Sequence, residues 1–503
     1  MIKIFPTATT KALDAYTIEH EPISSFDLME RAARAISAEL QSRWEEKDTP
    51  FVFFAGPGNN GGDALAVARL LGEAGYTRLT AYLFQVKDTL SEDCRANFEL
   101  LQMMPQVELT IVTNSFVPPT LTMDHVVVDG LFGSGLNKPL TGGFASVVRF
   151  LNTSKAYKVA IDMPSGLMGE DNTDNSTFVL HADLTLTLGQ PKLSFFFAEC
   201  QPYIGEWKAL DIRLSEEGIS ELETPYLLEE DEDFEYMLRP RNKFAHKGDF
   251  GRALLIAGQN GMAGASILAA KACLRSGVGL LTVHVPFCNN AILQTAVPEA
   301  MTHVDQHEVC FSVPVDTDHY QALGIGPGLG RNPETEQALL EQIEISEVPM
   351  VIDADAINLL EKHRNYLGRL PKNSILTPHP KELERLIGPC KNSYERLKKA
   401  RELAMNVRVH IVIKGAYTTI VTPDGTCYLN PSGNPGMATG GSGDVLTGIL
   451  LALLAQGYDA TTATRLGVYV HGVAGDLAAK KEGETGMIAS DIVASLPTIW
   501  KMI

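Results

Sequence analysis

The chain has 503 residues, of which 45% are hydrophobic, so it is too long for one hydrophobic core and should form two or three domains of a globular protein. Its formal net charge of −19, with no evident basic patch, argues against nucleic acids and anionic membranes as partners, and neither a membrane-spanning apolar run nor a signal peptide is evident. The seven cysteines are scattered without a CxxC pair, so we expect a cytoplasmic protein without a disulfide framework or a zinc site.

The first 75 residues predict a helix followed by a strand–loop–helix unit. Residues 11–45 place apolar side chains on one helical face: Leu13, Ile18, Leu28, Met29, Ala32, Ile36 and Leu40. A buried strand is expected over residues 51–55 and a helix over residues 64–72. The loop between them, residues 56–63, reads Gly-Pro-Gly-Asn-Asn-Gly-Gly-Asp and fits the dinucleotide-binding pattern G-x-G-x-x-G.

That pattern is weak when it stands alone. The next strand, residues 79–84, is followed by Gln85, where an NAD-binding Rossmann domain has an acidic residue for the ribose. This argues against a domain that transfers hydride. No Lys-Ser or Lys-Thr pair follows the glycines, which excludes a Walker phosphate loop.

Two further predicted strands also end in polar residues. Residues 126–128 lead into Asp129 and a glycine-rich turn, and residues 159–161 lead into Asp162 and then Ser165. Ligands bind at the carboxyl ends of parallel strands, so these side chains and that of Asn60 could converge on one site. The alternative is that each aspartate only caps the helix that follows it.

Three motifs in this half resemble those of the NAD(P)H-hydrate epimerase domain: GNNGGD at 58–63, VDGLFGSGL at 128–136 and IDMPSG at 161–166. The resemblance covers about residues 1–215 and implies a Rossmann-like three-layer αβα sandwich. It implies a potassium ion held by Asn60, Asp129 and Ser165, whose oxygen atoms suit such a cation. The implied substrate-binding residues are Asn59, Asn60, Gly61, Gly62, Asp63, Gly133, Ser134, Gly135, Leu136, Asn137, Lys138, Pro139 and Asp162. Asp162 is also our candidate for proton transfer, and the sequence departs from the family at Ala64, where glycine is expected.

Residues 216–238 are rich in Asp and Glu, which is typical of a solvated linker, and we predict a domain boundary there. Strand patterns then alternate with helix patterns through residues 239–503, as expected of a parallel α/β sandwich. The Thr-Pro-Asp-Gly sequence at residues 422–425 predicts the turn of a hairpin.

The segment 440–444 reads Gly-Gly-Ser-Gly-Asp and opens a long apolar helix. Glycines allow successive N–H groups to point at an anion, and the helix N-terminus adds positive charge. We therefore predict a phosphate-binding loop with Asp444 as a base beside it. The alternative is that Asp444 merely caps the helix.

The motifs of about residues 230–503 resemble the ADP- or ATP-dependent NAD(P)H-hydrate dehydratase, which has a ribokinase-like fold. The resemblance implies nucleotide-binding residues Lys414, Gly415, Ala416, Tyr417, Thr418 and Gly443. It implies substrate contacts at Ala265, Gly328, Gly330, His379 and Asp444. For His379 the alternative is a histidine that only packs a turn.

Together the two resemblances identify a member of the bifunctional NAD(P)H-hydrate repair enzymes. The implied first activity interconverts the R and S epimers of the hydrated cofactors NADHX and NADPHX. The implied second activity dehydrates the S epimer at the expense of ADP, or of ATP, with Mg²⁺, and Asp444 is its base. Two alternatives are a ribokinase-like kinase for a vitamin-precursor alcohol and a non-catalytic scaffold for RNA-associated partners. A homo-oligomer is compatible with the repair enzyme and with the kinase.

Overall fold

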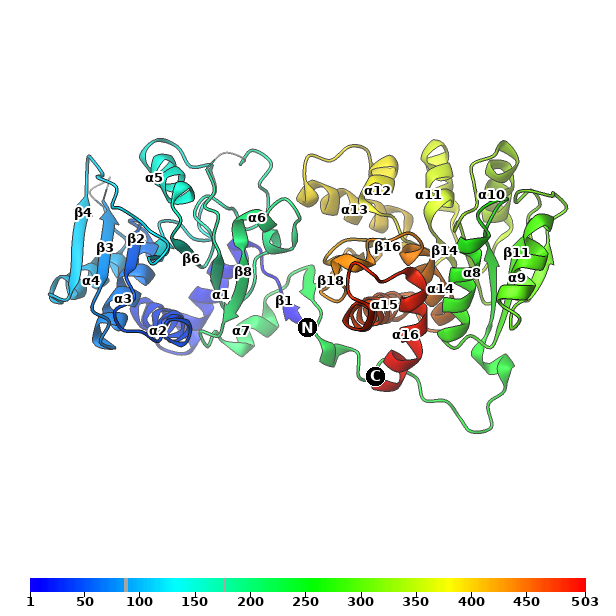
Figure 1. The fold of residues 1–503 in the computed structure, drawn as a ribbon, viewed down its shortest axis with the longest axis horizontal. Helices are drawn as coiled ribbons and strands as arrows, with labels where there is room; N and C mark the ends of the chain where they lie inside the picture. Colours follow the sequence, from blue (N-terminus) through cyan, green and yellow to red (C-terminus); the bar gives the residue numbers. More distant parts are fainter. Residues whose placement is uncertain (86–88, 176–177) are drawn as a thin grey trace. The chain divides into compact units, whose positions relative to one another are not determined.

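The computed structural model describes residues 1–85, 89–175 and 178–503. The chain forms two compact units, which are treated separately below (Figure 1). The amino-terminal unit comprises Lys3–Thr224 and Lys391–Tyr394, and the carboxy-terminal unit comprises the remainder. No helix in the described part of the chain has the length and apolar character needed to cross a membrane.

The acidic segment 216–238 is not the solvated linker that we expected. It contains helix α7 (Glu216–Glu221) and strand β9 (Tyr226–Leu228), which joins the sheet of the carboxy-terminal unit. Glu229 is 1% exposed and pairs with Arg465 Nε at 2.6 Å, while Asn430 Nδ2 donates to its other oxygen. The paired charge explains how part of an acidic run can be buried.

The amino-terminal unit contains a seven-stranded sheet in the order β4-β3-β2-β5-β6-β7-β8, with all neighbours parallel. Its strands are β2 (Phe51–Ala55), β3 (Leu79–Phe84), β4 (Val107–Val112), β5 (Val126–Gly130), β6 (Tyr157–Ile161), β7 (Leu184–Leu188) and β8 (Glu206–Leu210). Its other helices are α1 (Thr7–His20), α2 (Ser25–Arg43), α3 (Asn59–Glu73), α4 (Glu92–Gln102), α5 (Gly142–Thr153) and α6 (Gln201–Ile204).

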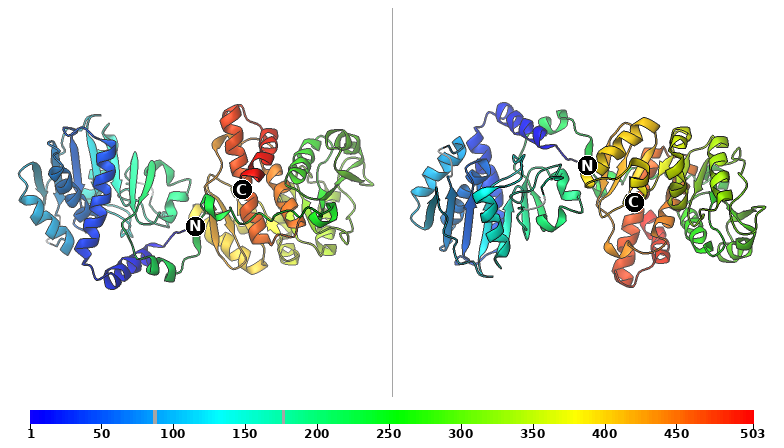
Figure 2. Two further views of the ribbon diagram at one scale, coloured as in Figure 1. Left: turned by 90° about the horizontal axis from the view of Figure 1, so that it is seen from below. Right: turned by 90° about the horizontal axis from the view of Figure 1, so that it is seen from above.

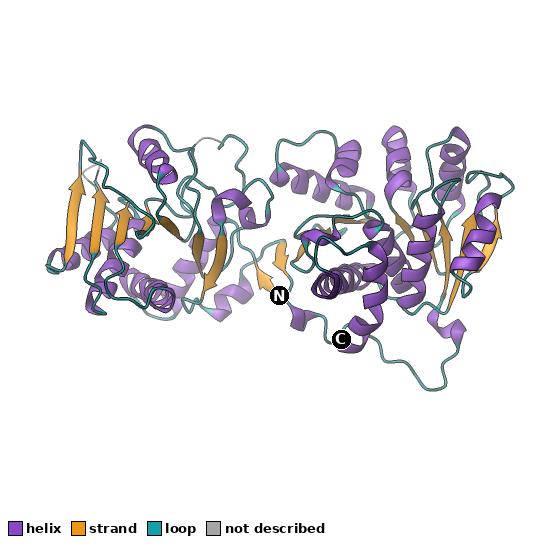
Figure 3. Ribbon diagram, in the orientation of Figure 1, coloured by secondary structure: helices purple, strands orange, loops and turns teal. Residues whose placement is uncertain are grey.

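Alternate residues of β2 pack against different helices on the two faces of this sheet. Phe51 and Phe53 belong to one apolar cluster with α2, α3 and α4. Val52 and Phe54 belong to another cluster with α5. Helices therefore cover both faces of the sheet (Figures 2 and 3). This arrangement confirms the predicted three-layer sandwich.

The single helix predicted over residues 11–45 is wrong, because two helices occupy this stretch. Helix α1 ends at His20, and Pro22 follows, a residue that does not continue a helix. Ser24 then starts α2 with a capping box: its Oγ accepts from Asp27 N at 3.0 Å, and its own N–H donates to Asp27 Oδ2 at 3.1 Å. The apolar pattern continues across the break because both helices bury one face.

The order of strands changes direction between β2 and β5. The chain proceeds from β2 to β3 and β4 on one side and then returns to place β5 on the other. In open α/β sheets, the crevice at such a point is the usual ligand site. Asn59 and Asn60 follow β2, and Asp129 lies at the end of β5, so the predicted residues lie at this point.

The carboxy-terminal unit contains an eleven-stranded sheet in the order β1-β9-β18-β17-β16-β15-β14-β13-β10-β11-β12. Its remaining strands are β1 (Ile2–Lys3), β10 (Arg252–Ile256), β11 (Leu280–Val285), β12 (Met301–Val304), β13 (Ala322–Ile325), β14 (Met350–Ile352), β15 (Ile375–Leu376), β16 (His410–Ile413), β17 (Thr418–Val421) and β18 (Cys427–Asn430). Its helices are α8 (Ala263–Arg275), α9 (Asn290–Ala296), α10 (Pro333–Ile345), α11 (Ala354–Leu360), α12 (Pro380–Ile387), α13 (Ser393–Val407), α14 (Ser442–Ala455), α15 (Ala460–Glu482) and α16 (Ala489–Met502).

The strands β10 to β16 are parallel to one another, which confirms the predicted parallel α/β sandwich. The predicted hairpin at residues 422–425 is confirmed too, since β17 and β18 are antiparallel and Gly425 turns at φ +87°. A second change of direction lies between β10 and β13. The predicted substrate residue Ala265 lies in the first turn of α8, which follows β10, and Gly328 and Gly330 lie in the loop after β13.

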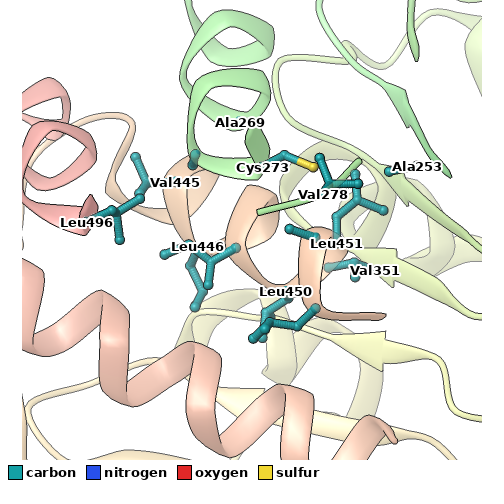
Figure 4. Close-up of a cluster of buried hydrophobic side chains, with 14 of the residues drawn as sticks. Ala253, Ala269, Cys273, Val278, Val351, Val445, Leu446, Leu450, Leu451 and Leu496 are labelled. Carbon is teal, nitrogen blue, oxygen red and sulfur yellow. The ribbon is translucent and has the colours of Figure 1, made fainter. Parts of the chain in front are cut away.

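Helix α14, which begins at Ser442 within the Gly-Gly-Ser-Gly-Asp segment, is buried along most of its length. Val445, Leu446 and Leu450 belong to one apolar cluster with Ala269 and Cys273 of α8 (Figure 4). The two helices approach closely at Gly448: a Cβ there would lie 2.1 Å from Ala269 O. The core thus fixes the Gly-Gly-Ser-Gly-Asp segment at one end of a rigid helix.

We predict that Gly448→Ala destabilises the carboxy-terminal unit by about 1–3 kcal/mol, because the added methyl group forces α8 and α14 apart. Thermal unfolding of the full chain would measure this cost. Gly368→Ala is the matched control, since a Cβ at Gly368 meets no atom within 4 Å. Equal melting temperatures for the two variants would contradict the close helix contact.

Candidate active sites

The amino-terminal unit has a cavity of about 160 Å³ at the carboxyl end of its sheet. Helix α1 contributes residues at helical spacing, and α2, α3, the end of β7 and four loops complete the wall. The lining residues are Thr10, Asp14, Ile18, Ser25, Leu28, Met29, Ala32, Asn59, Asp63, Ser134, Asp162, Leu188, Lys192 and Ile212.

Asp162 and Lys192 form a buried ion pair in this cavity. Lys192 Nζ lies 2.8 Å from Asp162 Oδ1, and their side chains are 5% and 10% exposed. Ser134 N donates to Asp162 Oδ2 at 2.9 Å. Although burial favours the neutral acid, the Lys192 ammonium and the Ser134 N–H hold the pKa of Asp162 below its usual value. Asp162 also has φ +63°, a strained conformation for a residue other than glycine.

Two other carboxyl groups of the cavity have raised pKa values. Burial, and then the charges of Asp162, Asp14 and Asp93, raise the pKa of Asp63 well above the usual range. Burial and the charge of Asp162 raise the pKa of Asp14 to about 6, against the opposing effect of Lys192. One ammonium group therefore faces three carboxyl groups, and they cannot all be ionised together at low cost.

Four of the predicted epimerase residues line this cavity: Asn59, Asp63, Ser134 and Asp162. The predicted glycine loop is shorter than expected, because α3 already begins at Asn59 and residues 59–63 are its first turns. Gly61 is required there, since a Cβ would lie 1.8 Å from Gly56 O. The other predicted residues of the second loop do not line the cavity: Gly133, Gly135, Leu136, Asn137, Lys138 and Pro139.

The structure brings Asp129 and Ser165 together beside the loop that contains Phe132 and Gly133. Asp129 is fully buried and accepts hydrogen bonds from Ser165 N at 2.8 Å and Ser165 Oγ at 2.7 Å. It also accepts from Leu131 N, so it does more than cap one turn. Asn60 lies beside the same loop: a Cβ on Gly133 would be 2.9 Å from its Oδ1. Its buried Nδ2 finds no hydrogen-bond partner in the described residues.

Ala64, where the family has glycine, causes no strain. It is buried inside α3 with a negative φ, and it packs against Gly130. A Cβ on Gly130 would lie 2.5 Å from the Ala64 Cβ. The methyl group of Ala64 therefore occupies space that the glycine of β5 leaves open.

The carboxy-terminal unit has a larger cavity of about 730 Å³ beside the Gly-Gly-Ser-Gly-Asp segment. The loop after β16, the loop after β18, the start of α14 and the middle of α15 supply its wall. The lining residues are His379, Lys414, Gly415, Ala416, Thr418, Ser432, Gly433, Asn434, Pro435, Met437, Ala438, Thr439, Ser442, Gly443, Leu446, Val468, His471 and Gly472. Of the predicted nucleotide residues, Tyr417 does not line it.

Asp444 does not cap α14, which excludes the alternative that the sequence left open. Gly441 is the N-cap residue at φ +95°, and Asp444 lies in the first turn of the helix. Burial raises the pKa of Asp444 to about 7, with a further contribution from the charge of Asp353 and an opposing one from Lys414. A carboxyl group with this pKa accepts a proton effectively near neutral pH.

A chain of polar contacts lies beneath this segment. Lys414 Nζ lies 2.8 Å from Asp353 Oδ1, and Thr447 Oγ1 donates to Asp353 Oδ2 at 2.8 Å. A Cβ on Gly443 would lie 3.3 Å from Lys414 Nζ. The half-buried His471 is bonded through Nε2 to Ser442 O at 3.0 Å, and removal from solvent lowers its pKa to about 4. Lys414 and the loop are therefore held in a fixed arrangement.

Of the predicted substrate residues of this unit, His379 lines the cavity, and Ala265, Gly328, Gly330 and Asp444 are not among its lining residues. A Cβ on Gly328 would lie 3.0 Å from Ala265 Cβ, so the start of α8 and the loop after β13 are in contact. Gly330 N donates to Asp355 Oδ2 at 3.0 Å. His379 lines the cavity, and its Nδ1 also accepts from Lys381 N at 3.1 Å as the cap of α12. His379 thus has the turn-packing contact and also faces the cavity.

Our sequence analysis did not assign site roles to Asp14, Lys192, Asp353, Thr447 and His471. The rule applied to Asp129, a polar residue where a strand ends, would have found Asp353 after β14 and Lys192 after β7. No comparable local signal marks Asp14, Thr447 or His471, which lie on helices.

The comparisons with known proteins agree with this organisation. The family model for NAD(P)H-hydrate dehydratase matches residues 253–498, and that for the YjeF-related protein N-terminus matches residues 25–194. A bifunctional NAD(P)H-hydrate repair enzyme from Moorella thermoacetica is 34% identical over 97% of this chain and 94% of its own. One from Coxiella burnetii is 34% identical over 99% of both chains.

Among solved structures, the ADP/ATP-dependent NAD(P)H-hydrate dehydratase from Bacillus subtilis, co-crystallised with ATP/Mg²⁺, is 33% identical. The match covers 53% of this chain and 94% of that one, with a TM-score of 0.47. The family assignment rests on the full-length relatives, since they span both units at over 30% identity. The chain therefore belongs to the family of bifunctional NAD(P)H-hydrate repair enzymes.

Proposed function

We propose that this protein repairs hydrated nicotinamide cofactors in the cytoplasm. The amino-terminal unit epimerises R- and S-NADHX and R- and S-NADPHX, and the carboxy-terminal unit dehydrates the S epimer at the expense of ADP or ATP. The observation that carries the second activity is Asp444, a carboxyl group of raised pKa in the first turn of α14. It stands beside the glycine segment, and Lys414 lies close to Gly443.

In the proposed dehydration, Asp444 takes the proton of the substrate C6 hydroxyl. The hydroxyl oxygen attacks the terminal phosphorus of the nucleotide. The phosphoryl group moves to the C6 oxygen, and the nucleotide, now one phosphate shorter, is the leaving group. Hydroxide is a poor leaving group and phosphate a good one, so the lone pair of the ring nitrogen can then expel phosphate from C6. Loss of a proton from C5 restores the double bond. In this proposal, the amides of Gly441 and Gly443 and the Lys414 ammonium stabilise the transferring phosphoryl group.

The residues of this site fit a nucleotide-bound Mg²⁺. That ion keeps several waters and usually takes only one or two protein carboxylates in addition to phosphate oxygens. Asp353 supplies such a carboxylate, since a Cβ on Gly443 would lie 3.5 Å from its Oδ2. Bound Mg²⁺ would neutralise the developing phosphate charge, while Lys414 and Thr447 orient the Asp353 carboxylate.

The direct test is to incubate the full chain with NADHX and either ADP or ATP and follow the return of the NADH absorbance band. Return of the band with a nucleotide, and none without it, is the expected result. A kinase for a vitamin-precursor alcohol would leave NADHX unchanged and phosphorylate the alcohol. A non-catalytic scaffold would consume neither substrate nor nucleotide.

The residues behind the amino-terminal cavity fit the potassium ion of the proposed epimerase. Asn60, Asp129 and Ser165 offer oxygen ligands and only one formal negative charge, which suits a monovalent cation. The ligand from Asn60 would be its Oδ1; its buried Nδ2, which has no partner among the described residues, is a donor and needs a separate acceptor. A bound K⁺ would supply charge that orients the substrate phosphates, while Asp129 and Ser165 hold the loop before Gly133 in place.

We predict that K⁺ raises the melting temperature of the amino-terminal unit relative to choline at equal ionic strength, and that Asp129→Asn removes this difference and lowers epimerase activity. The reason is that Asp129 is the one formally charged member of the proposed ligand set. Asp183→Asn is the control, because the exposed Asp183 also loses a bond from a backbone N–H but lies outside this set. An identical wild-type melt in both salts would show that these side chains are structural.

A further inference from the structure

The cavity of the amino-terminal unit contains one carboxyl group that neither the sequence motifs nor the amino-terminal family model covers. Asp14 lies on α1, and the model match begins only at residue 25. Its neighbours at helical spacing, Thr10 and Ile18, line the same cavity, so this face of α1 forms a wall of the site. The motif residues Asn59, Asp63 and Asp162 belong to other elements of the wall.

The environments of Asp14 and Asp162 differ strongly. Asp162 is fixed by Lys192 at 2.8 Å and by Ser134 N at 2.9 Å, and both contacts stabilise its ionised form. For the Asp14 carboxylate, no hydrogen bond or ion pair is found within the described residues, and its side chain is only half-buried at the cavity. The nearby negative charge of Asp162 favours a proton on Asp14.

Resting on the epimerase activity proposed above, we propose that Asp14 is the catalytic acid of epimerisation and that the ionised Asp162 is its partner base. Two carboxyl groups in one cavity, held in opposite protonation states, are the arrangement required for acid–base chemistry on one substrate. Asp63 is buried further and faces no separate cation, so it keeps its proton.

The step balances as follows. The Asp14 carboxyl group donates its proton to the C6 oxygen, the C6–O bond breaks, and water leaves with the bonding electrons. The lone pair of the ring nitrogen forms a C6=N bond. A second water gives a proton to the Asp162 carboxylate and attacks C6 from the opposite face, its electron pair forming the new C6–O bond. A proton passing from Asp162 to Asp14 restores the starting state.

The test uses the full chain and follows the interconversion of purified S- and R-NADHX. Asp14→Asn should lower the kcat of epimerisation by about 10²–10⁴-fold with KM unchanged. The wild-type kcat should fall as pH rises above about 6, as the Asp14 acid ionises. Asp14→Glu should retain much of the activity and this pH dependence. Dehydration of the S epimer by the same variants should be unchanged, which reports on folding and substrate quality.

Glu19→Gln is the matched control, because this exposed carboxylate lies on α1 but outside the cavity wall. Activity of Asp14→Asn equal to that of this control would overturn the acid role of Asp14 while leaving the epimerase function intact. A higher KM with unchanged kcat would also overturn it, since Asp14 would then only bind substrate. Failure of the wild-type chain to interconvert the epimers above the spontaneous rate would overturn the proposed epimerase and this inference together.

Discussion

Asp444→Asn is expected to lower the nucleotide-dependent dehydration of S-NADHX by about 10²–10⁴-fold, the usual effect of removing a general base. The variant keeps the shape of the side chain, and the N-cap of α14 is Gly441, so the helix should be preserved. The rate is measured from the return of the NADH absorbance band. Epimerisation by the same chain should be unaffected, because the amino-terminal unit has its own cavity.

The pH dependence gives a second readout of the same residue. Asp444 must be ionised to accept a proton, so dehydration by the wild type should rise through pH 7. Stability should change in the opposite sense. An acid with a raised pKa in the folded state binds its proton more tightly there, so stability falls as pH rises from about 4, the unfolded value, to about 7. Asp444→Asn should therefore melt higher than the wild type at pH 8.

Asp318→Asn is the matched control, since this aspartate is exposed and lies outside the cavity of the carboxy-terminal unit. It should change neither the rate nor the melting temperature. Retention of more than about a tenth of the wild-type dehydration rate by Asp444→Asn would refute its role as the base.

Lys192→Met is expected to abolish epimerisation and to destabilise the amino-terminal unit by about 3–5 kcal/mol, the usual cost of leaving one partner of a buried ion pair alone. Lys192 Nζ also donates to Thr187 Oγ1 at 3.0 Å and to Gln190 O at 3.0 Å, so three elements lose contacts. Denaturant unfolding would measure the stability, and the epimer assay the activity.

Lys208→Met is the control for this change. Lys208 pairs with Glu39 at 2.7 Å, but its side chain is 52% exposed, so the loss should cost about 1 kcal/mol or less. Adding Asp162→Asn to Lys192→Met should restore part of the stability, because the double variant has no uncompensated buried charge. If the two lysine variants were equally stable, the pair of Asp162 and Lys192 would be solvated rather than buried.

The sequence by itself predicted the features that depend on neighbouring residues. Gly61 lies close to the backbone of Gly56, and Gly441 has a left-handed φ. Both positions require glycine for reasons that arise within a few residues of the motif. The apolar run after Asp444 predicted a buried helix, and the alternation of strand and helix patterns over residues 239–503 predicted a parallel α/β unit. Polar residues at strand ends placed Asn60, Asp129 and Ser165 at one edge of a sheet because parallel strands end at the same edge.

Only the tertiary structure decided which charges meet. Asp353 contacts Thr447 across 94 residues, and Asp14 reaches the cavity from a helix that precedes the motifs. Such contacts depend on the strand order, with its changes of direction at β2/β5 and β10/β13, and local patterns do not encode that order. Burial reverses local expectations as well: it encloses Glu229 of the acidic segment against Arg465 and raises the pKa of Asp444 to a value useful for proton transfer. Both effects arise from the removal of water, which depends on the packing of elements distant in sequence.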